Sequence, residues 1–308
     1  MTPDVPMPVD WSSLLRDPHV DRLVTLAIEE DLGSGDLTSE ALFREPLQTR
    51  ARLVARSTTV VCGLPLAREI LRRFDAAATL DAQVSEGALC AAGTTLALIT
   101  ADTRALLGAE RPLLNFLMRL CGIAALTHAT VARVPAGSRC RIYDTRKTMP
   151  GWRALDKAAV RTGGGENHRM GLYDAVLIKD NHLAASASIT DAVGRVRAHT
   201  ARSTIIEVEI DHLDQLEEAI TNGADIILLD NFSMVDIAEA VRRARHRVLL
   251  EVSGGVRPEQ VESLAASGVD RISLGMLTHS AMPADLGRVH RRRRVRVDLD
   301  AAHHVVAG

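Results

Sequence analysis

The sequence predicts an α/β protein in which a smaller N-terminal α+β domain precedes a barrel of parallel strands. From residue 140 onward, short apolar runs alternate with helical patterns, as in parallel strands that are covered by helices. The strands recur about every 20 to 35 residues, which favours a barrel over an open doubly wound sheet. No Gly-x-Gly-x-x-Gly motif follows the first of these strands, which argues against a dinucleotide-binding fold.

The first 110 residues have a different pattern. A helix is expected over residues 20–31, and a glycine-rich turn follows it. Strand-like runs at 51–63 and 94–101 flank a helix at 66–74, and a long helical stretch over 104–134 leads to the barrel. This order predicts a small α+β domain followed by linking helices.

The barrel is expected to contain six strands with helices between them. The expected strands are residues 140–145, 173–180, 203–210, 224–230, 247–253 and 269–275. The expected division is an N-terminal domain with linking helices over 1–125, a catalytic barrel over 126–285 and a tail over 286–308. A return of this tail to the N-terminal domain is one placement for it.

Composition excludes several classes of protein. The chain has 37 Lys and Arg against 39 Asp and Glu, a net charge of −2, which argues against bulk electrostatic binding to nucleic acid or membrane. The four cysteines form no C-x-x-C motif, which favours buried thiols in a reduced, cytoplasmic protein. We expect no signal peptide and no apolar run of the roughly 18 residues that span a bilayer. The arginine-rich run at 290–298 is interpreted as a solvated charged end.

In such a barrel the chemistry lies at the carboxyl ends of the strands, and these ends are polar here. In order along the chain they carry Asp144 to Lys147, Lys179 to His182, Glu207 and Glu209, Asp230 and Asn231, Glu251 to Gly255, and Ser273 to Gly275.

The third strand, IIEVEI, places Glu207 and Glu209 on one face, because side chains alternate along a strand. The apolar residues between them face the helices, so both carboxylates point into the barrel. Buried carboxylates need cations, a metal or hydroxyl groups as partners. A structural ion pair with Lys147 or Lys179 is the alternative to a functional role.

Cations gather at the ends of the first two strands: Arg146, Lys147, His168, Arg169 and Lys179. Such a group repels itself unless an anion lies among it, so we expect a substrate with several negative charges. Arg111, far upstream in a helix, is either a part of this pocket or an exposed helix arginine.

The last two strands end in Ser253-Gly254-Gly255 and Ser273-Leu274-Gly275. Barrels commonly bind phosphate on backbone N–H groups at this place, and glycine allows a close approach. A plain turn explains one such loop equally well, but two on consecutive strands favour a phosphate site.

The stretch RTGGGENHRMG (161–171) raises a separate question. It lacks the Gly-Lys-Ser/Thr ending of a P-loop. His168 is a poor metal candidate, because no second ligand lies at helical spacing. We expect the glycines to turn the chain tightly, so that His168 and Arg169 bind a carboxylate beside Lys179.

The block DTRKTMPGWRALDKAAVRTGGGENHRMGLYDAVLIKDNH (144–182) resembles the core of the quinolinate phosphoribosyltransferase family. Further similar segments cover residues 15–285 in order, among them 29–40, 110–127, 207–210, 227–232, 251–256 and 268–280. The resemblance implies an N-terminal α/β sandwich, an open seven-stranded α/β barrel (TIM-barrel-like) and at least a homodimer. It also implies a Mg2+-dependent reaction of quinolinate with phosphoribosyl pyrophosphate, which gives nicotinate mononucleotide, pyrophosphate and CO2.

The resemblance also implies roles for individual residues. Arg146, His168, Arg169 and Lys179 are expected to hold the two quinolinate carboxylates, joined by Arg111 from the neighbouring subunit. Lys147 is expected to face the diphosphate or 5′-phosphate, and Glu209 and Asp230 to bind the ribose and help to place Mg2+. The remaining expected substrate-binding residues are Thr145, Ser253, Gly254, Gly255, Ser273, Leu274 and Gly275.

Two residues depart from the family pattern within the matched region. Cys121 stands where serine is expected, and Trp152 stands where a smaller apolar residue is expected. The alternatives to the expected activity are a relative that uses nicotinate, a barrel paralogue tied to metal uptake, an inactive binding protein, and an aldolase or isomerase with Lys179 as a Schiff base.

Overall fold

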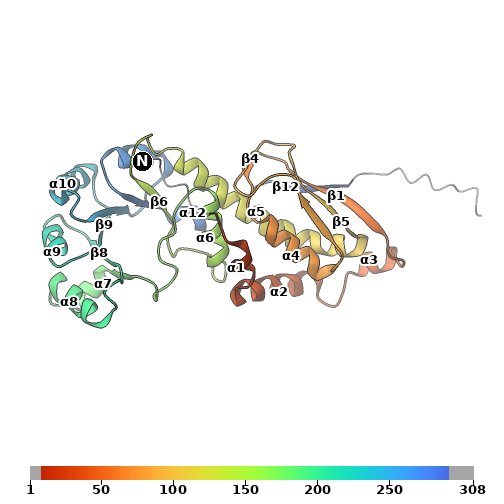
Figure 1. Cartoon of the computed structure of the whole chain (residues 1–308), viewed down its shortest axis with the longest axis horizontal. Helices are drawn as coiled ribbons and strands as arrows, with labels where there is room; N and C mark the ends of the chain where they lie inside the picture. Colours follow the sequence, from red (N-terminus) through yellow and green to blue (C-terminus); the bar gives the residue numbers. More distant parts are fainter. Residues whose placement is uncertain (1–7, 291–308) are drawn as a thin grey trace, which may run out of the picture.

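The computed structural model describes residues 8–290 of the 308-residue chain, with side chains up to Arg288. The molecule is elongated, with the barrel in one half and the N-terminal domain in the other (Figure 1). The arginine-rich run lies almost wholly outside the described residues, so its interpretation stays a prediction.

The N-terminal half is a four-stranded antiparallel sheet packed against helices. Its strand order is β12-β1-β5-β3, and a separate two-stranded sheet pairs β2 with β4. The strands are β1 (Gln48–Ala55), β2 (Thr59–Val60), β3 (Thr79–Ala82), β4 (Leu89–Cys90), β5 (Thr95–Asp102) and β12 (Leu286–His290). The helices are α1 (Trp11–Leu15), α2 (Pro18–Leu32), α3 (Leu37–Leu42) and α4 (Leu64–Phe74).

The helix α5 (Thr103–Val131) joins the two halves and continues past the expected boundary at residue 125 (Figure 1). The side chain of Asp102 accepts hydrogen bonds from the backbone N–H groups of Arg104 and Ala105, which starts the helix. By length and composition α5 could cross a membrane, contrary to the expectation above, but 56% of its most apolar window is buried inside the molecule. Its apolar residues thus serve as core.

The barrel half contains six parallel strands in the order β6-β11-β10-β9-β8-β7. Each contains residues from one of the six predicted runs: β6 (Arg141–Tyr143), β7 (Val176–Ile178), β8 (Ile206–Ile210), β9 (Ile226–Asp230), β10 (Leu249–Ser253) and β11 (Arg271–Ser273). The helices are α6 (Arg153–Thr162), α7 (Asp180–Ala184), α8 (Ile189–His199), α9 (Gln215–Thr221), α10 (Met234–Ala244), α11 (Val261–Ala266) and α12 (Met276–His279), with a 3-10 turn η1 (Pro258–Gln260).

The barrel is open between β6 and β7, and a seventh strand is not formed within residues 8–290. In its place Glu166 makes an isolated parallel bridge to Tyr143 of β6. The backbone N–H of Glu166 donates to the carbonyl of Ile142 over 2.7 Å, and the N–H of Asp144 donates to Glu166 over 3.1 Å. The glycine-rich stretch therefore runs along the open edge of the sheet and leads His168 into the barrel.

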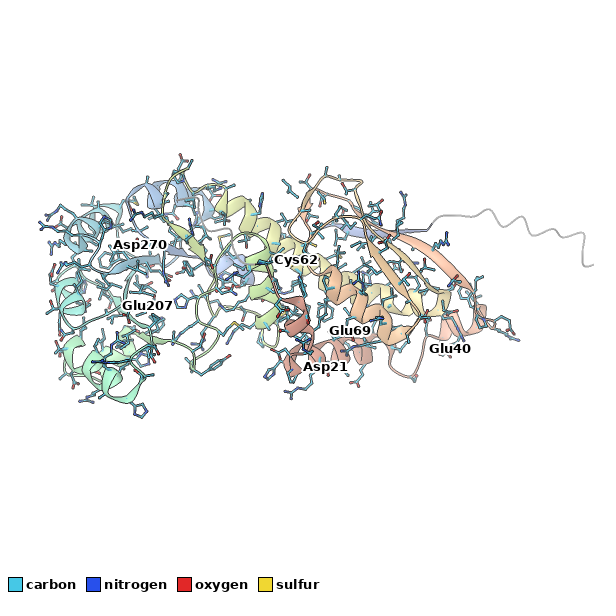
Figure 2. All side chains as sticks on the ribbon, in the orientation of Figure 1. Asp21, Glu40, Cys62, Glu69, Glu207 and Asp270 are labelled. Atoms are coloured by element: carbon cyan, nitrogen blue, oxygen red, sulfur yellow. The ribbon has the colours of Figure 1, made fainter. Side chains whose placement is uncertain are left out.

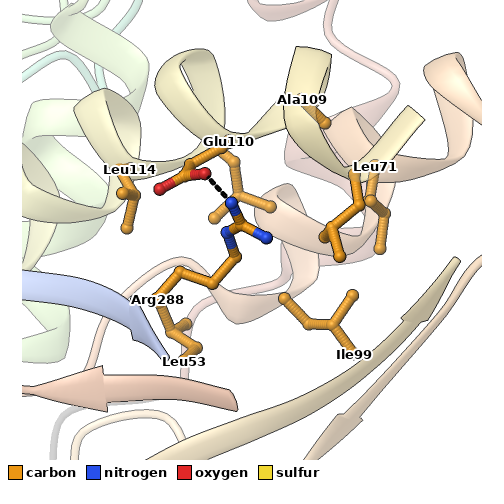
Figure 3. Close-up of a pocket in the computed structure, with 9 residues that line it drawn as sticks. Leu53, Leu71, Ile99, Ala109, Glu110, Leu114 and Arg288 are labelled. Atoms are coloured by element: carbon orange, nitrogen blue, oxygen red, sulfur yellow. Dashed lines mark hydrogen bonds and ion pairs between the residues drawn. The ribbon is translucent and has the colours of Figure 1, made fainter. Parts of the chain in front are cut away.

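The strand β12 carries the chain back to the N-terminal sheet, where it pairs antiparallel with β1. Arg288 of β12 forms an ion pair with Glu110 of α5, between apolar side chains that include Leu53 and Leu114 (Figure 3).

The cysteines and Trp152 have structural roles. All four cysteines are free and buried, as predicted, and the Cys121 thiol accepts a hydrogen bond from the backbone N–H of Cys62 over 3.3 Å. The Trp152 ring stacks on Phe116, and the Arg119 guanidinium lies 5.3 Å from its centroid. The larger residue at position 152 thus fills the contact between α5 and α6.

Candidate active site

The predicted phosphate loops line one cavity at the carboxyl ends of β10 and β11. It measures about 550 Å³, and Lys147 and His279 reach it from other segments. The predicted residues that line it are Lys147, Ser253, Gly254, Gly255, Ser273, Leu274 and Gly275. We call this cavity the glycine side of the site.

Glycine is needed at positions 254 and 275 because the backbone there lies close to neighbouring side chains. Gly254 has a φ of +93°, and a Cβ placed on it would lie 2.3 Å from Oδ1 of Asn231. A Cβ on Gly275 would lie 2.8 Å from Cδ of Lys147. Gly255 has a φ of +59° but open space around it. Side chains at 254 and 275 would therefore displace groups of the site.

His279 was missed from the sequence. It lies on α12, one turn after Gly275, and its ring is 3.2 Å from the Cβ position of that glycine. Its position could have been predicted from Gly275, because residues i and i+4 lie on the same face of a helix.

The other side of the site follows β6 and β7, and we call Arg146, His168, Arg169 and Lys179 the cationic side. Arg146 and Lys179 are exposed, and Arg169 is half-buried. Burial and the charge of Arg146 lower the pKa of Arg169, as expected for two neighbouring cations. Among the described residues the Nε of Arg169 has no hydrogen-bond partner.

A buried ion pair holds the backbone of the cationic side. The Nζ of Lys157 pairs with Asp144 and donates to the carbonyl of His168 over 2.8 Å, while the backbone N–H of His168 donates to Asp144 over 2.8 Å. Both charged side chains are at most 1% exposed. Burial raises the pKa of Asp144 to about 6 despite the nearby Lys157 charge, and burial lowers the pKa of Lys157.

Arg153 forms hydrogen bonds with three further groups of these loops. Its guanidinium donates to the carbonyls of Met170 and Arg146 over 3.0 and 3.4 Å and to the hydroxyl of Thr148 over 3.0 Å. Thr145 adds a local turn, because its hydroxyl accepts from the backbone N–H of Lys147 over 3.0 Å. Sequence reasoning missed Arg153 and Lys157, which position the predicted ligands.

The glycines of RTGGGENHRMG have two different functions. Only Gly164 needs the left-handed conformation, with a φ of +91°. A Cβ on Gly163 would lie 2.4 Å from the carbonyl of Ala124, and one on Gly165 would lie 2.8 Å from the Thr127 side chain. The expected tight turn is therefore also a close contact with α5.

Both predicted carboxylates of β8 are buried, and their contacts with His168 and Lys179 place them toward the barrel interior, as the alternation predicted. Glu209 forms an ion pair with Lys179, with 2.7 Å between Oε2 and Nζ. This is the ion pair with Lys179 that was the alternative to a functional role. Asp230, half-buried at the end of β9, accepts a hydrogen bond from the Asn231 amide over 2.7 Å.

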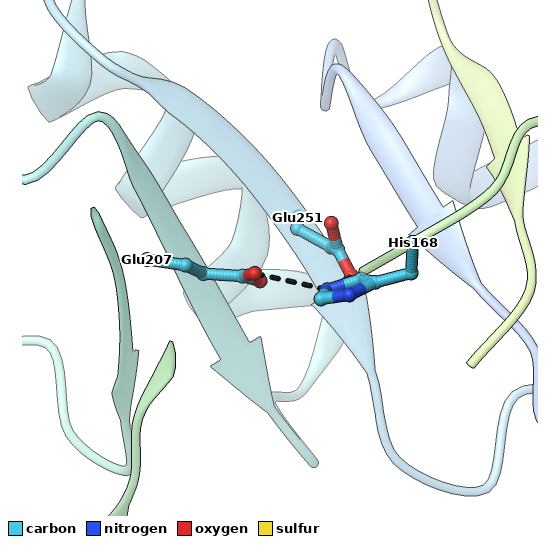
Figure 4. A group of neighbouring side chains, drawn as sticks. All are labelled: His168, Glu207 and Glu251. Carbon is cyan, nitrogen blue, oxygen red and sulfur yellow. Dashed lines mark ion pairs between the residues drawn. The ribbon is translucent and has the colours of Figure 1, made fainter. Parts of the chain in front are cut away.

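Glu207 does not form the alternative ion pair with Lys147 or Lys179. It contacts His168 instead, with 2.9 Å between Oε2 and Nε2. Glu251 of β10 approaches the same ring nitrogen to 3.5 Å, so the three side chains form a buried group (Figure 4). Figure 2 places Glu207 well inside the barrel half.

Burial and nearby charges have opposing effects on the pKa of His168. Burial alone would lower the pKa of His168, but the hydrogen bond and charge of Glu207, with the charge of Glu251, raise it above its ordinary value. Burial and the Glu207 charge raise the pKa of Glu251 to about 7. The three ligand atoms also lie within 4.8 Å of one another, a proximity that the sequence spacing of His168 did not reveal.

Arg111 is exposed on α5 and lines neither the glycine side nor the adjoining hollow below Lys147. Arg119, eight residues and about 12 Å further along the helix, contacts the barrel instead. Its guanidinium binds both oxygens of the Asp156 carboxylate, over 2.9 and 2.7 Å, and donates to the carbonyl of Thr278 over 3.2 Å. Arg111 therefore lines neither of these two cavities of its own chain.

The fold and the site together define an α/β-barrel enzyme that binds a substrate or substrates with several anionic groups. The cationic side and the glycine side lie at one edge of the barrel, because the strands run parallel. The carboxylates of β8 and β9 lie at the same edge.

Comparisons with known proteins identify the family. The model of the quinolinate phosphoribosyl transferase C-terminal domain matches residues 123–288, and that of the N-terminal domain matches residues 36–121. Nicotinate-nucleotide pyrophosphorylase [carboxylating] of Mycobacterium leprae is 42% identical over 270 residues, which cover 85% of this chain and 93% of the relative. Quinolinate phosphoribosyltransferase [decarboxylating] 1b of Nicotiana tabacum is 33% identical over 285 residues, with 86% and 80% covered.

A solved structure agrees. The nicotinate-nucleotide pyrophosphorylase from Francisella tularensis has a TM-score of 0.84 and 37% sequence identity, and the match covers 88% of this chain and 95% of that one. The chain therefore belongs to the quinolinate phosphoribosyl transferase family.

Proposed function

We propose that this chain transfers the phosphoribosyl group of phosphoribosyl pyrophosphate to quinolinate, with decarboxylation, to give nicotinate mononucleotide, pyrophosphate and CO2. This is the activity for which its relatives are named, and it supplies de novo NAD synthesis. One observation carries the proposal: a fixed set of cations lies at the same barrel edge as a glycine-lined cavity. A dicarboxylate and a phosphate fit these two sides.

The cationic side would bind the two carboxylates of quinolinate. Arg146, Arg169 and Lys179 supply charge, and the Lys157–Asp144 pair fixes the backbone of His168. Guanidinium groups suit carboxylates because they donate two parallel hydrogen bonds. A monocarboxylate such as nicotinate would leave part of this charge unmatched.

The glycine side would bind the 5′-phosphate of the second substrate. Backbone N–H groups of residues 253–255 and 273–275, with Lys147 beside Gly275, suit an anion of that size. Glu209 and Asp230 would hold the ribose hydroxyls. The two substrates would then meet above the barrel with their reacting atoms aligned.

The bond changes follow from this arrangement. The C1–O bond to pyrophosphate breaks while the pyridine nitrogen forms a bond to C1, and the carboxylates of Glu209 and Asp230 stabilise the positive charge that develops on the ribose. The ring nitrogen is then cationic, so it stabilises the electron pair that stays on C2 when the C2 carboxylate leaves as CO2. A proton from water or from Lys147 then replaces the carboxylate at C2.

The residues present fit a magnesium ion. Glu209 and Asp230 end two adjacent strands and offer carboxylate oxygens, the donor type that Mg2+ prefers. The diphosphate would supply most of the ligands. When bound, the ion would neutralise charge on the leaving pyrophosphate.

We further propose a cytoplasmic homodimer in which Arg111 completes the cationic side of the neighbouring subunit. The support is the exposure of Arg111 on α5, away from the cavity of its own chain. A higher oligomer built from such dimers would serve equally well.

The activity is tested with purified protein, quinolinate, phosphoribosyl pyrophosphate and Mg2+, by following nicotinate mononucleotide. Product should form, and omission of Mg2+ should abolish it. Failure to form product, or a faster turnover of nicotinate than of quinolinate, would refute the proposal.

The shared site is tested by mixing two inactive proteins, Arg111→Ala and Lys179→Ala. If Arg111 acts in the neighbouring subunit, mixed dimers contain one intact site and recover about a quarter of the wild-type activity after subunit exchange. A mixture no more active than its parents would show that Arg111 is not supplied in this way.

A further inference from the structure

Glu251 is a buried carboxyl group for which the mechanism above has no use. Its side chain is fully buried on β10. The Ser273 side chain on β11 is the hydrogen-bonding group that lowers its pKa, whereas Nε2 of His168 lies 3.5 Å away and donates its hydrogen to Glu207 over 2.9 Å (Figure 4). One N–H therefore faces two carboxylates, and among the described residues no cation donates a hydrogen bond to Glu251.

The groups that face Glu251 come from every neighbouring element. Glu207 on β8 adds a negative charge, and His168 adds a positive one when it is protonated. Arg271 on β11 lies 3.8 Å away, too far for a hydrogen bond, and its guanidinium is stacked 4.6 Å from the centroid of the Tyr143 ring. Tyr143 on β6 stays neutral, because burial raises the pKa of its hydroxyl.

A bound substrate with two negative charges changes the electrostatic environment of Glu251. His168 sits at the inner end of the cationic side, so a dicarboxylate bound there brings two more negative charges toward Glu207 and Glu251. Like charges close together raise the affinity of a carboxylate for protons. Glu251 is the group that can respond, because among the described residues no cation holds it by a hydrogen bond.

We propose that Glu251 is a positioning residue that takes up a proton when the dicarboxylate binds, so that His168 stays in place between Glu207 and the backbone N–H of Arg169, which donates to its Nδ1 over 2.8 Å. The proposal rests on the proposed function, because it requires quinolinate or an equivalent dianion on the cationic side. Protonated Glu251 becomes a donor, and it no longer competes with the substrate for His168.

The protonation state in the empty site supports this. The pKa of Glu251 is about 7, so about half of the molecules carry the proton at pH 7. A rise of about one unit on binding would bring this fraction to about nine-tenths, which corresponds to an uptake of about 0.4 proton.

The test is calorimetric titration at pH 7 with benzene-1,2-dicarboxylate, which has the two adjacent carboxylates of quinolinate but no ring nitrogen to react. Titrations in three buffers of different ionisation enthalpy, with EDTA present, give the number of protons taken up. Wild type should take up about 0.4 proton, and Glu251→Gln less than a quarter of that. Glu166→Gln, which changes a carboxylate paired with Arg161 at the open edge of the sheet, should behave as wild type.

Each result is decisive. Uptake that persists in Glu251→Gln, or no uptake by wild type, would overturn the inference. Metal in the EDTA-free protein that is bound through His168, Glu207 and Glu251 would also overturn it, because a metal would take the place of the proton. Thermal melting establishes that the variant is folded, and replacing a buried carboxylate by an amide should not lower its stability. Normal proton uptake without nicotinate mononucleotide formation would refute the proposed function and leave this inference standing.

Discussion

The cationic side holds its charges through buried ion pairs, whereas the glycine side presents mainly backbone. On the cationic side Lys157 and Asp144 hold the backbone of His168 by hydrogen bonds, and Arg153 joins the loop at Arg146 and Thr148 to the loop at Met170. On the glycine side the loop at Gly254 and Gly255 bends at positive φ, and Lys147 and His279 provide the cationic and imidazole groups at the cavity wall.

Under the proposed function, the difference would follow from what each side recognises. Two carboxylates on a planar ring have fixed directions, so the groups that bind them must be fixed as well, and buried pairs do this. A phosphate is nearly spherical, so a concave backbone with N–H groups suffices. The energetic cost also differs, because the Lys157–Asp144 pair that supports the cationic side is kept out of water.

The largest effect is expected from breaking the buried pair of the cationic side. Lys157→Met leaves Asp144 buried without its partner, which should lower the free energy of unfolding by about 3–5 kcal/mol. Denaturant unfolding measures this. Arg195→Met removes an exposed pair with Asp191 and should cost less than about 1 kcal/mol.

A double variant separates positioning from stability. Asp144→Asn with Lys157→Met removes both charges and should recover most of the lost stability, but it should not recover quinolinate turnover. Full activity in the double variant would show that the pair does not position His168.

Glu251 is also buried, and we expect it to cause a smaller, pH-dependent change in the free energy of unfolding. The pKa of Glu251 is about 7 in the folded protein against 4.5 in the unfolded chain, so the folded state binds the proton more tightly. Its stabilising contribution is complete below pH 4.5 and is lost as the pH rises through 7. Glu251→Gln cannot ionise, so its stability relative to wild type should increase between pH 5 and pH 8, by at most about 3 kcal/mol. Thermal melts across this range measure it, and an unchanged difference would contradict the assignment.

On the glycine side, Gly254→Ala should raise KM for phosphoribosyl pyrophosphate by about 10- to 100-fold, or about 1.4–2.8 kcal/mol. The new methyl group would collide with Asn231, and the strand ends would have to separate. Gly255→Ala, with open space around it, should have a distinctly smaller effect. Steady-state kinetics with each substrate varied would show this, and a change mainly in the KM of quinolinate would contradict the division into two sides.

The smallest effect is expected from Arg153→Met. It loosens the carbonyls of Arg146 and Met170 without removing a ligand, so KM for quinolinate should rise about 10-fold, or about 1.4 kcal/mol. KM for phosphoribosyl pyrophosphate should stay within about twofold of wild type. Equal changes in both values would mean that Arg153 supports the whole edge of the barrel.

The strands and the faces of their side chains could be predicted because they depend on local alternation. IIEVEI places Glu207 and Glu209 inward whatever surrounds it, and the six barrel strands were located in the same way. The seventh strand could not be predicted from local pattern, and in its place Glu166 makes one bridge to β6.

The partners could not be predicted, because they depend on how distant segments meet. Lys157 lies in a helix pattern where a lysine usually faces water, and it is buried only because the glycine-rich stretch folds over it. Glu251 meets His168 because their segments both face the interior of the barrel. Arg119 and Arg111 are alike in sequence, and only the packing of α6 and α12 on α5 distinguishes them.

The strand β12 also determines when the N-terminal sheet can be completed during synthesis. A ribosome releases β1, β3 and β5 early, but the partner of β1 is encoded by residues 286–290. Domains generally fold as units in the order in which they emerge. Here, however, the N-terminal sheet cannot be completed until the barrel has been synthesised. Until then one edge of β1 is unpaired, and such an edge invites pairing with other chains. A nascent chain stalled before residue 286 should therefore be more prone to aggregation than the finished protein.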